Sequence, residues 1–154
     1  MNETIANESD KTPVGAKTPW HLWIVGVVGL LWNSMGVFDF VMTVTKNETY
    51  MGEFTQEQLD FFYGFPAWLV LVWAVAVIGG LIGILLLLLR SKLAVPVFGA
   101  SLVAMVITAI HNYGFDKMYE IGGVGGVIFT VVIFVIALLL VIYSVTMQKR
   151  GVLK

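Results

Sequence analysis

Two polar side chains stand inside a stretch of sequence that is otherwise apolar enough to cross a membrane. The stretch 20–45 contains Asn33 and Asp39, and Asp39 is the only carboxylate inside any of the long apolar stretches of the chain. A charged aspartate in hydrocarbon costs about 2.5–3.5 kcal/mol on insertion scales, so we expect Asp39 to be protonated, paired or in contact with water. A proton- or cation-binding group in a polar cavity meets this requirement, and so does a structural hydrogen-bonding group near the outer interface.

Counting residues from the ends of the apolar stretches suggests partners for Asp39. Thr108 lies at a comparable height in the third stretch, and His111 lies about one turn, ~5 Å, farther out. A hydrogen bond between Asp39 and His111, assisted by Thr108 or Asn33, is therefore sterically open if the first and third helices touch. The candidate residues of a substrate or proton path are Asp39, Asn33, His111, Thr108 and Trp32.

Small residues recur at helical spacing on the same face as these polar groups. Gly26, Gly29 and Gly36 are separated from Asn33 and Asp39 by steps of three or four, which places them along one side of a helix. Helices in lipid associate through close approach across small residues, so this face is expected to contact protein. The expected packing residues are Gly26, Gly29 and Gly36 in the first stretch, Ala76, Gly80 and Gly83 in the second, and Ser101 and Ala104 in the third.

The remaining chemistry-bearing residues argue against an enzyme. The chain has no cysteine, which excludes thiol nucleophiles, disulfides and thiolate metal sites. The apolar stretches contain no paired carboxylates and no nucleophile–base pair, so we expect no catalytic residue, no metal and no cofactor. A haem between the two histidines is excluded, because His21 and His111 would stand ~25–30 Å apart along the membrane normal.

These side chains must be positioned by membrane-spanning helices. The 154 residues are 58% hydrophobic and only 12% charged, beyond the apolar share of a soluble domain. Apolar windows recur at about 20–45, 66–89, 93–113 and 122–147, and a helix needs about 20 residues to cross the hydrocarbon. The sequence therefore predicts an all-α bundle of four transmembrane helices over 20–148, with a flexible tail at 1–19 and a basic C-terminal tail at 149–154.

The distribution of basic residues predicts the orientation. Of the 9 lysines and arginines, all but two lie in the N-terminal tail, the loop between the second and third helices, or the C-terminal tail. Because basic residues are retained on the cytoplasmic side, both termini should lie inside. In the first outer loop, Thr55 and Gln58 have the spacing of a capping box, which predicts a short interfacial helix at about 56–63. The glycine-rich segment 122–126 is expected to form a flexible entry to the fourth helix.

Several features of the chain together resemble a known family. The most distinctive are Leu31-Trp32-Asn33, Gly36 with Asp39, Phe65-Pro66-Ala67-Trp68, Gly79-Gly80, and Arg90-Ser91-Lys92 before Ala94 and Pro96. Over about residues 20–147 the chain resembles a family of small bacterial four-helix membrane proteins labelled "sugar transporter". The resemblance implies the bacterial cytoplasmic membrane and the four-helix topology. Where this chain has Phe40 after the aspartate, the family usually has tyrosine.

Two functions from different classes fit these observations. The first is an oligomeric transporter of a small solute in which Asp39, Asn33 and His111 line a polar path between subunits. The second is a non-catalytic accessory or scaffold subunit of a larger membrane complex. Both require the lipid bilayer and either a homo-oligomer or a larger complex as partner. A net charge of -1 with no basic stripe excludes nucleic acid as a partner.

Overall fold

All regular secondary structure in the described part of the chain is α-helical. The computed structural model describes residues 17–114 and 118–154, so most of the predicted N-terminal tail lies outside the described residues. The helices are α1 (Trp20–Val44), α2 (Glu48–Met51), α3 (Gln56–Tyr63), α4 (Ala67–Leu88), α5 (Ala94–Gly114) and α6 (Met118–Lys149). Four of them, α1, α4, α5 and α6, are long and apolar enough to cross a membrane. This confirms the prediction of an all-α chain with four candidate membrane spans.

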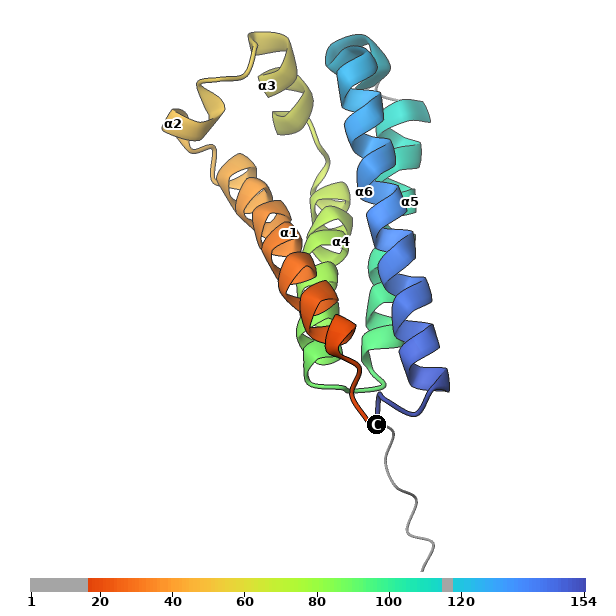
Figure 1. Cartoon of the computed structure of the whole chain (residues 1–154). Helices are drawn as coiled ribbons and strands as arrows, with labels where there is room; N and C mark the ends of the chain where they lie inside the picture. The colour runs from red at the N-terminus through yellow and green to blue at the C-terminus, as the bar shows by residue number, and fades with distance from the viewer. Residues whose placement is uncertain (1–16, 115–117) are drawn as a thin grey trace, which may run out of the picture.

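The four long helices pack in series. α4 contacts both α1 and α5, and α5 contacts α6 (Figure 1). The start of α1, the turn between α4 and α5, and the C-terminus lie together at one end of the bundle. We call this the basic end, because six described basic residues gather there: Lys17, Arg90, Lys92, Lys149, Arg150 and Lys154. The loops with α2 and α3 lie at the other end, which we call the loop end. The clustering of basic residues at one end is the pattern from which the inward orientation of both termini is predicted.

Small residues on one helix face large ones on the next. Along the α1–α4 contact, Gly26 faces Leu88 and Gly29 faces Ile84, while Gly80 of α4 faces Asn33 of α1. Each step of three or four residues up α1 is matched by a step of four residues down α4, as expected of an antiparallel pair. The same register ends in the edge-to-face contact of Phe40 with Trp73, with ring centroids 4.9 Å apart. Gly83 likewise lies against the ring of Phe98 on α5.

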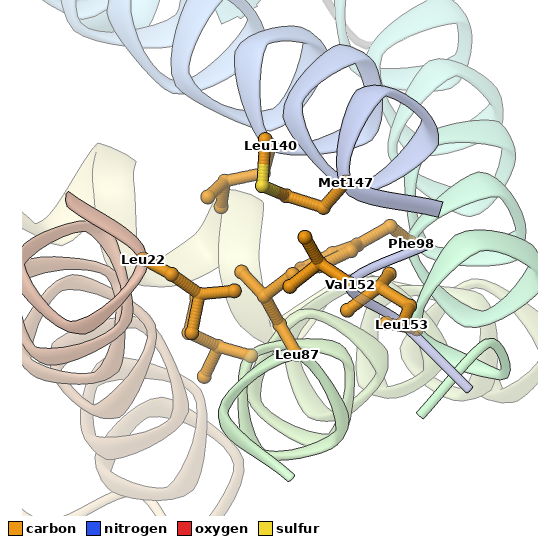
Figure 2. Packing of buried hydrophobic residues seen from close by; sticks show 9 residues of the cluster. Leu22, Leu87, Phe98, Leu140, Met147, Val152 and Leu153 are labelled. Carbon is orange, nitrogen blue, oxygen red and sulfur yellow. The ribbon is translucent and has the colours of Figure 1, made fainter. Parts of the chain in front are cut away.

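The C-terminal residues close the basic end. Gly151 has φ of 70°, a left-handed conformation that ends α6 and turns the chain back. Val152 and Leu153 then insert beside Leu87, Phe98 and Met147 (Figure 2). The backbone of Lys154 is held by the α4–α5 turn, since its N–H donates to Arg90 O (2.7 Å) and its carbonyl accepts from Lys92 N–H (3.1 Å). The basic tail is thus docked on the bundle through its apolar residues.

At the loop end, α3 starts with the predicted cap. The Thr55 hydroxyl accepts from Gln58 N–H, and the Gln58 side chain accepts from Thr55 N–H. Both bonds of the capping box are therefore formed, and the helix Gln56–Tyr63 is confirmed. Its placement at the membrane interface stays a prediction. Phe61 and Phe62 pack edge to face with each other and with Phe65, and Phe62 also stacks on Trp73 of α4.

The start of α6 differs from the expectation. The helix begins at Met118, so that the glycine-rich segment 122–126 lies within it rather than before it. Gly123 has φ of 55° and ψ of −162°, and the helix is kinked there. A residue with a side chain is strained at such a φ, whereas glycine adopts it freely. The segment is therefore helical with one kink, and its predicted flexibility stays a prediction.

Candidate functional site

Asp39 lies near the loop end of α1 and is bound by a tyrosine from the first loop. It stands five residues before the last residue of α1, about 7–8 Å from the helix end. The hydroxyl of Tyr50, in α2, donates a hydrogen bond to Asp39 Oδ1 at 2.6 Å. Hydrogen bonds to an ionised acceptor are short and strong, so this bond both satisfies the carboxylate and ties α2 to α1. Tyr50 of the first loop is thus the partner that Asp39 needs inside an apolar helix.

The local sequence explains why Tyr50 reaches Asp39. Lys46 has φ of 53°, which turns the chain sharply after α1. Asn47 then caps α2, because its side chain accepts from Tyr50 N–H at 3.0 Å. The Tyr50 ring lies between Phe38 and Phe54, with centroids 5.7 Å and 5.9 Å away. Ring packing and the cap together hold the phenol over the carboxylate.

The carboxylate of Asp39 changes the acidity of its partner. The hydrogen bond from Tyr50 to Asp39, with smaller contributions from burial and from the charge of Asp39, raises the pKa of Tyr50 to about 12 from 10.0. Ionising the phenol would remove the donated proton and place two negative charges side by side. Tyr50 therefore stays neutral across the physiological range and remains a hydrogen-bond donor.

A pocket of about 530 Å³ opens beside this pair at the loop end. Its wall combines aromatic rings with acidic, amide and hydroxyl groups. The lining residues are Phe38, Met42, Asn47, Thr49, Tyr50, Glu53 and Phe54. A mostly apolar wall with a few oriented polar groups is typical of sites for small molecules. Tyr50 is the residue shared by the pocket and the Asp39 hydrogen bond.

Asn33 lies at the contact between α1 and α4. Its amide Nδ2 donates to the carbonyl of Gly29 at 2.7 Å. Its Oδ1 lies directly over Gly80, where an added Cβ would overlap it. Ser101 of α5 approaches the same glycine, and its hydroxyl donates to the carbonyl of Ala76 at 2.5 Å. These polar groups join α1, α4 and α5 at mid-helix.

The other predicted path residues lie apart from Asp39. The Thr108 hydroxyl donates to the Ala104 carbonyl on its own helix at 3.0 Å. His111 lies against Trp68 and Phe65, with ring centroids 5.4 Å and 6.5 Å away. α4 contacts both α1 and α5 in the series of helices, and the hydrogen bond found at the Asp39 carboxyl group comes from Tyr50.

Trp32 and the remaining predicted packing residues have different surroundings. Trp32 contacts Phe129 of α6, with centroids 6.5 Å apart, on a different side of α1 from the Asn33 contact with α4. Ala104 is buried in α5. Gly36 has no side-chain or distant backbone atom within 4 Å of an added Cβ, so there is open space beside it between the Asn33 and Phe40 contacts with α4. The predicted path residues therefore lie in four places: Asp39 beside the first loop, Asn33 against α4, Thr108 and His111 on α5, and Trp32 against α6.

Three pairs were not predicted from the sequence. They are Asp39 with Tyr50, His21 with Tyr143 (Nδ1 to hydroxyl 2.6 Å), and Tyr113 with Thr130 (hydroxyl to hydroxyl 2.8 Å). Each pair contains a tyrosine near the end of a span. The preference of tyrosine for the membrane interface predicts this position but not the partner. Within residues 17–114 and 118–154, no three histidine or acidic side chains are grouped as a metal site.

Comparisons with models of known protein families, with curated proteins and with solved structures found no match to this chain.

Proposed function

We propose that the chain is a subunit of an oligomeric transporter of a small polar solute in the bacterial cytoplasmic membrane, with the Asp39–Tyr50 pair at its outer mouth. One observation carries the proposal: the one carboxylate inside the predicted spans is bonded to a residue that lines an open, aromatic and acidic pocket. A solute held in that pocket would meet Tyr50, and any change at Tyr50 would alter the environment of Asp39. This coupling is what a solute-sensitive or proton-sensitive carboxylate requires.

The proposal needs more than one copy of the chain. Asn33, Ser101 and Thr108 are bonded to backbone carbonyls of their own chain and offer no continuous polar route past α4. A route from Asp39 across the membrane would therefore run between copies.

The test separates the charge of Asp39 from its structural role. Asp39→Asn keeps an oxygen that accepts from Tyr50 but removes the charge. Tyr50→Phe removes the donor but keeps the carboxylate. Wild-type and variant protein are reconstituted into vesicles, and flux of protons is followed with an internal pH-sensitive dye, alone and with a panel of labelled monosaccharides outside.

The proposal expects flux above that of protein-free vesicles in wild type, loss of that flux in Asp39→Asn, and residual flux in Tyr50→Phe. Both variants should retain wild-type helix content by circular dichroism. Equal flux in wild type and Asp39→Asn would refute a role for the charge, and wild-type flux no greater than that of empty vesicles would refute transport of these probes.

A specific observation favours a second candidate, the accessory or scaffold subunit. The hydroxyl and amide groups inside the spans bond to carbonyls of the chain itself, as groups that stabilise a bundle do. In this case the protein would leave the membrane in mild detergent with a larger partner at fixed stoichiometry. Asp39→Asn would leave that association and the thermal stability unchanged, and no flux would depend on Asp39.

A further inference from the structure

A second, larger pocket lies between α1 and α6 near the basic end. It has a volume of about 770 Å³, and Asp39 is not among its lining residues. Figure 1 shows the two helices diverging from the basic end towards the loop end. On the α6 side its wall runs from Ile136 to Arg150, about 21 Å at 1.5 Å per residue. Half of a hydrocarbon core is ~15 Å thick, so the groove is as long as one leaflet and its headgroup region.

The end of the groove at the basic end is polar and cationic. Arg150 is exposed there, and the hydroxyl of Tyr143 lies 2.6 Å from His21 Nδ1. None of the described residues that line the groove is acidic. An anion at this end would therefore meet a guanidinium with no competing carboxylate in the wall. Arginine binds phosphate oxygens through two parallel N–H groups, which makes it the preferred partner of a phosphate.

The rest of the groove is apolar and its walls are bulky. Ile24 and Val28 on α1 and Leu139 and Ile142 on α6 are all more than half exposed in the chain alone. A second helix packs closely in lipid only across small residues. The one glycine in the groove wall, Gly29, is already covered by Ile84. Branched, uneven walls of this kind suit a flexible acyl chain better than a helix.

We propose that this groove is a binding site for an anionic phospholipid. The phosphate lies at Arg150, beside the hydroxyl of Tyr143, and one acyl chain follows the α1–α6 groove past Val28 towards Trp32. The lipid fills the gap left where α1 and α6 diverge and so fixes their spacing. The charge at one end, the leaflet-long apolar wall and the absence of acidic lining residues together select this occupant.

The test measures lipid retention by native mass spectrometry. Protein is purified in detergent containing equal amounts of phosphatidylglycerol and phosphatidylcholine, and bound lipid is counted in wild type, Arg150→Gln, Lys149→Gln and Val28→Trp. Lys149 is the matched control, because it is an adjacent exposed cation that does not line the groove. Helix content of each variant is checked by circular dichroism.

Wild type should retain phosphatidylglycerol about tenfold more than phosphatidylcholine, because the choline cation of phosphatidylcholine offsets the charge of its own phosphate and weakens its attraction to Arg150. Arg150→Gln should lose that preference, and Lys149→Gln should keep it. Val28→Trp, which fills the apolar groove, should retain less of both lipids. Equal retention of the two lipids by wild type would overturn the proposal, as would equal effects of the Arg150 and Lys149 substitutions or unchanged retention in Val28→Trp.

Discussion

At the scale of single residues, the free-energy cost of placing the Asp39 carboxyl group in α1 is offset by a hydrogen bond from the Tyr50 hydroxyl. Asp39 is near enough to the helix end for a loop residue to reach it, and Tyr50 is held in place by the Asn47 cap and by its aromatic neighbours. The bond therefore links the membrane-spanning part of the chain to its loop end. Any agent that ionises Tyr50 should loosen that link.

The raised pKa of Tyr50 gives a prediction for stability against pH. Because its folded-state pKa is about 12 and its ordinary value 10.0, the Tyr50–Asp39 bond contributes fully below pH 10 and is lost as pH rises through about 12. Wild type should be more stable than Tyr50→Phe at pH 8, and the difference should vanish between pH 10 and pH 12. Thermal unfolding in detergent at a series of pH values measures it. A constant difference across this range would contradict the assignment.

At the scale of helices, the register of α1 on α4 depends on alternation of small and large residues. Gly26, Gly29 and Gly80 each receive a side chain from the facing helix. Lipid provides no hydrophobic force between helices, so this close fit and the bonds of Asn33 and Ser101 hold the series together. Interior positions of this kind tolerate added volume poorly.

Gly80→Ala should destabilise the bundle by about 1–3 kcal/mol, since the added methyl group displaces the Asn33 amide from its place over α4. Gly99→Ala is the matched control: it makes the same substitution in a neighbouring helix, but no atom lies within 4 Å of the added Cβ. The free energies of unfolding of the two variants are compared by adding increasing denaturant to protein in detergent and following tryptophan fluorescence. Equal effects of the two substitutions would argue against the α1–α4 register.

The sequence was sufficient to predict where the helices lie along the chain, but not which helices contact one another. Apolar length alone identifies α1, α4, α5 and α6, and the capping box locates α3, because both signals are local. Which helix lies beside which is not local. The expectation that Asp39 meets His111 used heights along the membrane normal, which say nothing about the interposed α4.

Two further features of the elements escaped the sequence pattern for physical reasons. The kink at Gly123 depends on a single backbone angle, and glycines in a helix do not reveal which of them adopts it. The docking of Val152 and Leu153 depends on a cavity formed by Leu87, Phe98 and Met147 from three helices. The flanking basic residues identified this segment only as a basic tail.

At the scale of the whole molecule, the charge asymmetry predicts how the bundle sits in the membrane. The described basic end carries six lysines and arginines, and Lys46 is the one described basic residue at the loop end. The basic end should therefore face the cytoplasm. Since the chain contains no cysteine, single cysteines report the topology without background.

In intact cells, a membrane-impermeant maleimide should label Glu53→Cys at the loop end. Ser91→Cys, in the α4–α5 turn, should react only after the membrane is permeabilised. Both positions lie outside the four long helices. Labelling of Ser91→Cys in intact cells with protection of Glu53→Cys would invert the orientation and place the Asp39 pocket inside.

The most direct test of the account is a double-mutant cycle on the Asp39–Tyr50 pair. The free energy of unfolding is measured for wild type, Asp39→Ala, Tyr50→Phe and the double variant, and the same cycle is repeated with His111→Ala in place of Tyr50→Phe. The account predicts a coupling of about 1 kcal/mol for Asp39 with Tyr50 and additive effects for Asp39 with His111. Additivity in the first cycle together with coupling in the second would contradict it.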